Sequence, residues 1–210
     1  DVVPNVTPDN NSRTATILLN VKEGEMMRIR EIHVNGNDKT RDNVVRRELR
    51  LDEQDVVDTL ALKRSFQRLN NLNFFETVEI LPQQVDVDKV DLNVKVKEKP
   101  TGQFSIGGGF STLDKLVGIA DITEGNLGGN GWMGRIRGQL GQQRTLGLIT
   151  FRNPYLNDSL TSMQLDIYRS MTNYMTYFEK KSGASITFGR WFSEYASGSV
   201  SLFAEQLNFS

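Results

Sequence analysis

Few side chains in this sequence have the types and spacing that chemistry requires. Asp86, Asp88 and Asp91 lie at intervals that could place carboxylates around a calcium ion. The glycine at position six and the closing glutamate of a calcium-binding loop are missing, however. The sequence therefore favours a solvated polar turn at these aspartates, and we expect no metal ion.

The segment Gly125–Gly131 is rich enough in glycine to hold a phosphate group through backbone N–H groups. It lacks the Gly-Lys-Ser/Thr ending of a phosphate-binding loop, so a tight hairpin turn is sufficient to explain it. The single histidine, His33, has no nucleophile motif associated with it. We therefore expect no enzyme, no nucleotide and no cofactor.

The composition excludes further classes of protein. The chain has 210 residues, no cysteine and a formal charge of −1. The absence of cysteine excludes disulfide scaffolds and thiolate metal sites, and the near-zero charge argues against a nucleic-acid-binding protein. No apolar run reaches the 18 residues that a membrane-spanning helix needs.

The two halves of the chain differ sharply. The first hundred residues contain 16 Lys/Arg, 18 Asp/Glu and two glycines. The remaining residues contain 9 Lys/Arg, 8 Asp/Glu and 16 glycines. A shift of this size predicts a domain boundary, which we place at 98–102. Residues 1–25 show an alternating strand at 14–22 with a hairpin partner near Val2–Val6, and we interpret them as the end of a preceding domain.

Residues 26–99 predict an α+β domain in the order β-α-α-β-β. In a strand at Met27–Val34, the alternation of apolar residues shifts by one position between Ile29 and Ile32, which indicates a bulge. Thr40 is placed to cap a first helix that turns Val44, Val45 and Leu49 inward. A second helix starts at Asp58 or Thr59, with an inward stripe at helical spacing made of Leu62, Phe66, Leu69 and Leu72.

Two strands close this domain. Phe75–Leu81 is followed by a polar turn at 82–88 and by a strand in which Val90, Leu92, Val94 and Val96 alternate with polar residues. One edge strand should remain unpaired and could accept a strand from another chain. The candidate edge residues are Phe75, Glu76, Thr77, Val78, Glu79 and Ile80.

Residues 101–210 predict seven strands, near 102–110, 115–124, 131–140, 143–151, 161–170, 183–192 and 198–208. Alternation alone does not distinguish a membrane barrel from a soluble sandwich. Even strand lengths near the roughly ten residues that span a bilayer favour the barrel. So do aromatic residues beside every second turn, which would form an interfacial girdle: Trp132, Tyr155, Trp191 and Tyr195. The connection 171–181 is expected to be a long loop at the opposite end. Seven strands do not close a typical barrel, so we expect a fragment.

Seven short motifs, in order along the chain, resemble the POTRA-plus-barrel family of outer-membrane assembly factors of Gram-negative bacteria. They are Ile32–Asn37, Val45–Leu49, Leu69–Val78, Val94–Glu98, Gly107–Phe110, Glu124–Gly131 and Asn153–Tyr155. One departure is Asn73, which stands where the family has glycine; asparagine also tolerates positive φ. The resemblance implies a membrane-proximal POTRA domain at 26–99, followed by the first seven of about sixteen antiparallel transmembrane strands of a β-barrel.

The resemblance also implies a function. Such proteins fold and insert other β-barrels into the outer membrane, with POTRA domains in the periplasm. Their partners are nascent outer-membrane proteins, accessory outer-membrane lipoproteins and the lipid bilayer. The first barrel strand would pair poorly with the last strand, so that a lateral gate opens between them. A client strand would pair with the freed edge of the first strand: Gln103, Phe104, Ser105, Ile106, Gly107, Gly108 and Gly109.

Two alternatives remain open. The same layout serves protein secretion pores and autotransporter-assembly factors. A passive outer-membrane channel would also fit the strand pattern.

The first helix of the α+β domain carries three arginines, Arg46, Arg47 and Arg50. They could either meet an acidic partner or form a solvated helix face.

Overall fold

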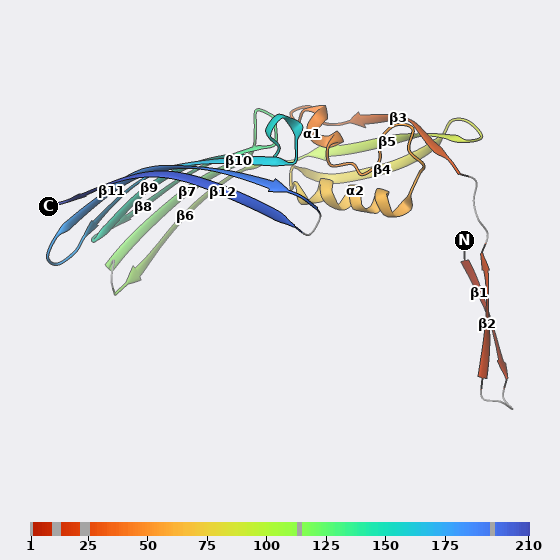
Figure 1. Cartoon of the computed structure of the whole chain (residues 1–210), viewed down its shortest axis with the longest axis horizontal. Coiled ribbons are helices and arrows are strands. Elements are labelled where there is room, and N and C mark those ends of the chain that lie inside the picture. Colours follow the sequence, from red (N-terminus) through yellow and green to blue (C-terminus); the bar gives the residue numbers. More distant parts are fainter. Residues whose placement is uncertain (1, 10–13, 22–25, 113–114, 194–195) are drawn as a thin grey trace.

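A computed structural model describes residues 2–9, 14–21, 26–112, 115–193 and 196–210. Its strands form three sheets, of two, seven and three strands (Figure 1). The two-stranded sheet is the hairpin of β1 (Val2–Asp9) and β2 (Thr14–Val21), paired antiparallel from Val2↔Val21 to Asp9↔Thr14. The predicted hairpin partner of the strand at 14–22 is thus confirmed, and the turn between them lies outside the described residues.

The α+β unit (residues 26–99) contains β3 (Arg28–Asn35), α1 (Asp42–Arg46), α2 (Thr59–Asn71), β4 (Phe75–Gln84) and β5 (Lys89–Glu98). Its sheet has the order β3-β5-β4, with β3 parallel and β4 antiparallel to the central β5. The register of β3 shifts between Ile29 and Ile32, which confirms the predicted bulge. Val90, Leu92, Val94 and Val96 are all buried on one face of β5, the face that the helices cover.

The helices differ in part from the prediction. The second helix, α2, starts at Thr59, one of the two predicted starts, and the Asp58 side chain caps it by accepting a hydrogen bond from the Leu60 N–H. Thr40 does not cap α1, which begins at Asp42 after Arg41 and has no side-chain cap. Thr40 is instead almost fully buried, because its backbone and side chain bind groups outside the helix.

The inward stripe of α2 was wrong at one position. Phe66 is 44% exposed, whereas the neighbouring Ser65 is buried. The Ser65 hydroxyl donates to the Ala61 carbonyl at 2.8 Å and accepts from the Arg50 N–H at 2.8 Å. A small polar side chain thus occupies the inward position, because it satisfies a backbone group of the chain segment that follows α1.

Strand β4 extends beyond its predicted end at Leu81. It continues through Pro82, which pairs with Leu92, to Gln84. Proline is tolerated here because β4 lies at the edge of the sheet, where a missing N–H on the open side breaks no ladder bond. The turn that precedes β5 is correspondingly short.

The seven-stranded sheet is an antiparallel meander in which each strand pairs with its neighbours in sequence. Its strands are β6 (Gly102–Ser111), β7 (Lys115–Leu127), β8 (Trp132–Gly141), β9 (Arg144–Asn153), β10 (Thr161–Asn173), β11 (Phe178–Trp191) and β12 (Ser197–Phe209). The sheet is bent along its strands (Figure 1). All seven predicted strands are present.

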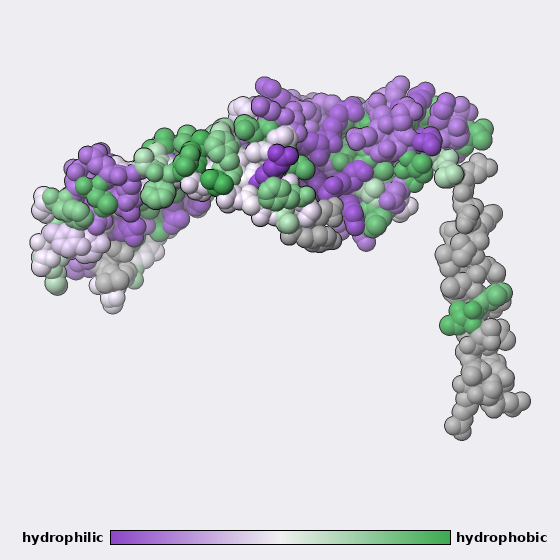
Figure 2. All heavy atoms as spheres, in the orientation of Figure 1, coloured by the Kyte–Doolittle hydropathy of each residue, from purple (hydrophilic) through white to green (hydrophobic). Residues whose placement is uncertain are grey.

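One face of this sheet is apolar and open. The register aligns Ile122, Ile136, Ile149 and Ile167 across four neighbouring strands, and each is about half exposed. The other face carries polar groups, including an ion pair of 2.5 Å between Arg135 and Asp121. Figure 2 shows hydrophobic residues gathered over part of the sheet, beside an α+β unit whose visible surface is mainly hydrophilic.

The connections fall at two ends of the sheet. Two turns, at 128–131 and 154–160, lie on the side of the α+β unit, where β11 also ends and β12 begins (Figure 1). At the opposite end the predicted loop 171–181 was wrong, since β10 reaches Asn173 and β11 starts at Phe178. Tyr174 and Tyr177 stack at 4.5 Å between ring centroids, and the Tyr174 N–H donates to the Tyr177 carbonyl at 2.9 Å, which closes a short hairpin.

Candidate functional site

Strand β6 forms one free edge of the seven-stranded sheet, with β7 as its only strand partner among the described residues. The predicted gate residues 103–109 all lie on this strand. Phe104 and Ile106 are 65% and 73% exposed on the apolar face. Because an edge strand presents a row of unpaired backbone groups, β6 is a template on which another strand can add.

Three consecutive glycines weaken the outer half of this edge, the half of β6 that lies farther from the α+β unit. A Cβ atom at Gly107 or at Gly109 would meet no atom within 4 Å, and one at Gly108 would meet only the Val117 carbonyl oxygen at 3.5 Å. No close contact therefore requires glycine at these positions. Glycine instead lowers the stability of the strand, because it loses most entropy on ordering and contributes no side-chain packing.

The base of β6 is attached to the α+β unit. Glu98, the last residue of β5, accepts hydrogen bonds from the Lys39 N–H at 2.9 Å and the Thr40 N–H at 2.6 Å. The Thr40 hydroxyl accepts one from the Asn126 amide at 2.9 Å. The turn after β7 is thereby bound to the segment that precedes α1.

Close backbone approach makes this attachment possible. The Arg41 N–H donates to the Gly129 carbonyl at 2.9 Å. Gly129 has φ +74°, and a Cβ atom there would lie 1.9 Å from the Lys39 carbonyl oxygen. A Cβ atom at Gly131 (φ +69°) would lie 2.6 Å from Nη2 of Arg47. Gly129 is required both by its conformation and by its contact with the Lys39 backbone, whereas Gly131 is required by its positive φ.

A second turn contacts the α+β unit through Tyr155. The Arg47 guanidinium lies over the Tyr155 ring at 4.3 Å, and Nη2 of Arg68 donates to the phenol oxygen at 3.2 Å. Arg68 also pairs with the buried Glu48 at 2.8 Å. Burial, reinforced by Glu48, raises the pKa of the Tyr155 phenol. Asp158 accepts from Asn43 at 3.1 Å and lies 3.5 Å from Arg47.

The structure separates the four predicted girdle residues. Trp132 lies in β8 and packs edge-on against Phe151 at 5.6 Å, whereas Tyr155 is a contact of the α+β unit. Trp191 lies at the end of β11 and is 53% exposed. Tyr195 lies outside the described residues. Of the three girdle residues that the structure describes, Tyr155 is bound to the α+β unit, and the girdle itself stays a prediction.

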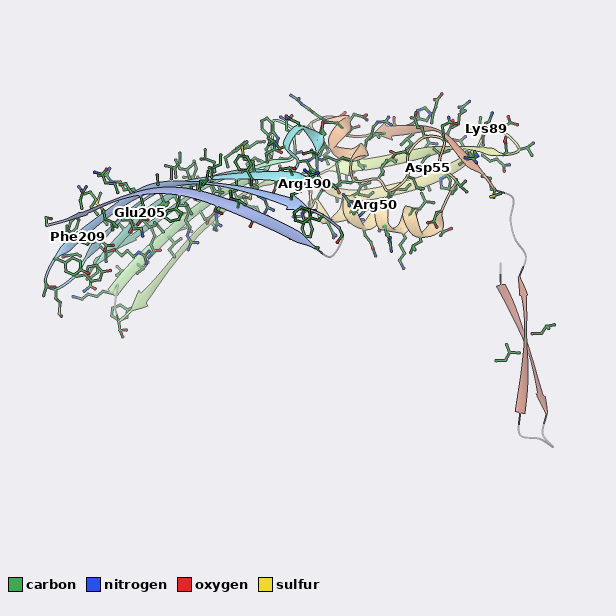
Figure 3. All side chains as sticks on the ribbon, in the orientation of Figure 1. Arg50, Asp55, Lys89, Arg190, Glu205 and Phe209 are labelled. Carbon is green, nitrogen blue, oxygen red and sulfur yellow. The ribbon has the colours of Figure 1, made fainter. Side chains whose placement is uncertain are left out.

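A groove of about 850 Å³ lies between the α+β unit and the ends of β9 to β11. Its lining includes Trp191 and five arginines, Arg47, Arg50, Arg64, Arg68 and Arg152, with Glu48 as the carboxylate among its lining residues. Figure 3 shows Arg50 and Arg190 at this junction and Phe209 at the opposite end of the sheet. Arg47 was predicted to meet either an acidic partner or solvent. Its side chain is only 11% exposed and is instead in contact with other residues of this chain.

The predicted edge strand of the α+β unit is β4. Phe75 and Val78 are buried in the core, while Glu76, Thr77 and Glu79 face solvent. Glu76 forms an ion pair of 2.7 Å with Lys97 on β5. The opposite side of β4 has no strand partner in the part of the chain that the structure describes, so its backbone is open to an added strand.

No group of three His, Cys, Asp or Glu side chains that could hold a metal ion occurs in the described segments. Asp91 binds Arg30 at 2.8 and 2.5 Å, which lowers the pKa of the Asp91 carboxyl. His33 lies 3.7 Å from Asp91 on the sheet face opposite the core. In the same described segments, no helix has the length and apolar character needed to cross a membrane.

Five of the seven sequence motifs contribute residues to the junction between the two parts. Glu98, Asn126, Gly129, Arg47 and Tyr155 come from four of them and are brought together by the contacts above. Phe74 comes from a fifth, and its ring lies 3.6 Å from the Cβ position of Gly125. Asn73 has φ +60°, as predicted from its place in the motif, and its side chain accepts from Lys99 at 2.6 Å. Sequence spacing could not show this meeting, since the partners lie 58 to 87 residues apart.

Two family models match the chain. The POTRA model, described as a surface antigen variable number repeat, matches residues 27–99, and the Omp85 superfamily domain matches residues 126–210. The chain is 32% identical over 209 residues to the outer membrane protein assembly factor BamA of Neisseria meningitidis, covering 95% of this chain and 26% of that protein. It is 35% identical over 178 residues to BamA of Nitratidesulfovibrio vulgaris, covering 84% and 22%.

The crystal structure of Haemophilus ducreyi BamA lacking POTRA domains 1–3 superposes with a TM-score of 0.82 at 28% identity. The match covers 100% of this chain and 41% of that one. This chain thus spans about a quarter of the length of the curated relatives. The comparisons confirm the predicted fold class, an α+β POTRA domain followed by antiparallel barrel strands, here as a seven-stranded sheet.

We predict that Gly129→Ala disrupts the docking of the first turn, because its Cβ would overlap the Lys39 carbonyl. We expect a loss of about 2 kcal/mol or more in the free energy of unfolding, measured by urea denaturation in detergent. Gly128→Ala is the matched control, since Gly128 also has positive φ (+58°) but its Cβ would meet only the Asn130 side chain, at 3.3 Å. Equal losses in both variants would contradict the overlap.

We predict that Glu98 makes stability depend on pH. Burial works to raise the pKa of Glu98, but hydrogen bonds from Thr40 and Lys39 outweigh it and lower the pKa below its ordinary value. Its stabilisation is therefore present above about pH 4.5 and lost as the pH falls through the lowered pKa. Glu98→Gln should reduce the free energy of unfolding at pH 7, and the difference from wild type should narrow below pH 4. Glu79→Gln is the control, and a difference that stayed constant with pH would count against this role.

Proposed function

This chain belongs to the POTRA-plus-barrel proteins of the Omp85 superfamily, and we propose that the complete protein folds and inserts β-barrel proteins into the bacterial outer membrane. Nascent outer-membrane proteins are its clients, and accessory outer-membrane lipoproteins assist it. The α+β unit is periplasmic, and the seven-stranded sheet belongs to a barrel in the bilayer. The work needs no catalytic residue, nucleotide or cofactor.

The observation that carries this proposal is the free, glycine-weakened edge of β6. A client strand that enters an apolar membrane must satisfy its backbone hydrogen bonds at every stage. Pairing with β6 supplies those bonds before the client barrel is closed. A weak edge then releases the client, since Gly107, Gly108 and Gly109 hold few contacts that must be broken.

The faces of the sheet support its placement in lipid. The apolar face carries the half-exposed isoleucines of β7 to β10, which would be costly against water and favourable against acyl chains. Arg135 and Asp121 pair on the other face, away from lipid, where a charged group is tolerated. The turns at 128–131 and 154–160, on the side of the α+β unit, then lie at the periplasmic surface.

The second element of the proposal is client capture at β4. An extended segment can add to its open side through backbone hydrogen bonds, with little dependence on sequence. Such capture would hold an unfolded client next to the base of β6. The same edge could bind an accessory lipoprotein.

Two other functions use the same layout. A protein secretion pore or an autotransporter-assembly factor would pass its client through or beside the barrel without a β4 complex with lipoproteins. A passive channel would show single-channel conductance but would not insert clients. Reconstitution of the complete protein in lipid vesicles separates these cases, because only an insertase raises the rate at which an unfolded barrel protein becomes folded in the bilayer.

We predict that the triple change Gly107→Val, Gly108→Val and Gly109→Val slows insertion. Valine favours the strand over glycine by up to about 1 kcal/mol at each position, so three changes should reduce the insertion rate roughly ten-fold or more. The double change Gly138→Val and Gly147→Val is the control. These glycines also have open space around Cβ but pair with each other inside the sheet. Unchanged rates in the triple variant would remove the gate role of these glycines.

We predict that photo-crosslinkers at Glu76 and Glu79 capture unfolded clients or an accessory lipoprotein in cells. Both side chains are exposed on the open-edged β4. Lys63, which is also exposed and lies on α2, is the control position. If Glu76 and Glu79 yielded no more adducts than Lys63, β4 would not be the capture site, while the gate at β6 would stand.

A further inference from the structure

The link between the two domains is very short. Strand β5 ends at Glu98 and β6 starts at Gly102, with Pro100 in between. The Lys99 N–H donates to the Phe74 carbonyl at 3.0 Å, and its ammonium group binds the Asn73 side chain at 2.6 Å. The linker is therefore held against the end of α2 and the start of β4, and it does not act as a free tether.

A chain of side-chain hydrogen bonds returns from the base of β6 to the α+β unit. The Thr101 hydroxyl donates to the Glu124 carboxylate, which also accepts from the Asn126 N–H at 3.0 Å. The Asn126 side chain then donates to Thr40 at 2.9 Å and accepts from the Gly131 N–H at 2.8 Å.

Thr40 completes a closed circuit. Its N–H donates to Glu98 at 2.6 Å, and from Glu98 the backbone leads through the linker back to Thr101. We call this circuit of Glu98, Thr40, Asn126, Glu124 and Thr101 the hinge ring. Thr40 is 2% exposed, so its bonds are protected from water. Buried hydrogen bonds of this kind are costly to leave unmade.

The rest of β6 has nothing comparable. From Gln103 to Phe110 no side chain makes a hydrogen bond to any residue that the structure describes, and Phe110 is 78% exposed. This part of the strand is held by its ladder with β7, and the three glycines lie in its outer half. The strand is thus fixed at one end and weak at the other.

We propose that Asn126 is the positioning residue of a hinge that fixes the base of β6 to the POTRA domain, so that the gate opens from Phe110 toward Gln103. The hinge ring keeps the first residues of the edge in place while the outer residues separate. A client strand would consequently meet a fixed starting point next to the POTRA domain. The biological role of the hinge rests on the proposed function. The hydrogen-exchange experiment that tests the hinge does not.

Asn126 has a well-matched control in the same turn. The Asn130 side chain donates to the carbonyls of Leu127 and Gly128, at 3.5 and 3.3 Å, and makes no bond outside the turn. Asn126→Ala breaks the ring, whereas Asn130→Ala removes bonds of the turn alone. A general effect of a damaged turn would appear in both variants.

The experiment measures amide hydrogen exchange of β6 in the complete protein, reconstituted in lipid nanodiscs. In the wild type, we expect the amides of 107–110 that point away from β7, toward the gate, to exchange faster than those on the same side at 103–106. Asn126→Ala should speed exchange at 103–106 by about five-fold, the factor that one net hydrogen bond represents. Asn130→Ala should leave this segment unchanged.

A redox-controlled variant separates positioning from folding. The chain has no cysteine, so Thr40→Cys with Asn126→Cys introduces a single pair at a side-chain contact of the ring. In the oxidised variant, we expect the amides of 103–106 to exchange slowly. In the reduced variant, their exchange rate should match that of Asn126→Ala. The comparison uses one polypeptide in two states, so it holds even if Asn126→Ala itself folds poorly.

Three results would overturn the hinge: no exchange gradient along wild-type β6, equal effects of Asn126→Ala and Asn130→Ala, or no difference between the oxidised and reduced pair. Insertion assays on the same samples keep the two proposals apart. A gradient with no insertion activity in any sample would refute the proposed function and leave the hinge. Insertion without a gradient would refute the hinge alone.

Discussion

The outer strand of a β-sheet carries backbone N–H and C=O groups that need partners, and the rest of this molecule depends on that requirement. In water an open edge is tolerable, whereas in an apolar membrane each unpaired group costs several kcal/mol. The seven-stranded sheet ends at β6 and β12. An edge of this kind must be closed by another strand, and an edge that serves exchange must also be easy to reopen. Glycine at 107–109 meets the second condition without abolishing the first, because it removes packing and leaves the ladder bonds intact.

A strand that opens easily needs an anchor, and the anchor here consists of buried polar groups. Glu48 and Arg47 are largely enclosed between the POTRA domain and the second turn. One oxygen of Glu48 and two nitrogens of Arg47 have no hydrogen-bond partner among the described residues. Buried charges of this kind add little net stability, because desolvation offsets their attraction. Their geometry, however, permits few alternative arrangements. This pair thus fixes the orientation of the POTRA domain more than it strengthens the fold.

The sequence was sufficient to predict the secondary-structure elements, but it was insufficient to predict the contacts at the junction between the two domains. Alternation and composition are local signals, so the strands of both domains, the bulge near Ile29 and the start of the second helix near Asp58 could be predicted. Phe66 was assigned inward because helical spacing does not show that Ser65 satisfies the Arg50 N–H. Thr40 has the chemistry of a cap, and only the fold reveals that Glu98 and Asn126 are its partners. Tyr155 was assigned to a membrane girdle because an aromatic residue near a turn has the same local signature whether it meets lipid or Arg47. Whatever depends on contacts between distant segments lay beyond the pattern.

The same reasoning explains why the proposed exchange of strands needs no reactive side chain. Exchange of one strand for another breaks and makes similar backbone hydrogen bonds, so its net free energy is small and no external energy source is required for each bond. What a protein can control is the barrier and the geometry of the exchange. The residues at the junction act on geometry: Gly129 lets two backbones approach, Asn73 turns the chain at positive φ, and Asn126 joins the turn to Thr40. In the proposed exchange, the glycines of β6 act on the barrier. Motifs that carry no catalytic group are therefore what such a function requires, since strand exchange depends on where an edge begins and how readily it opens.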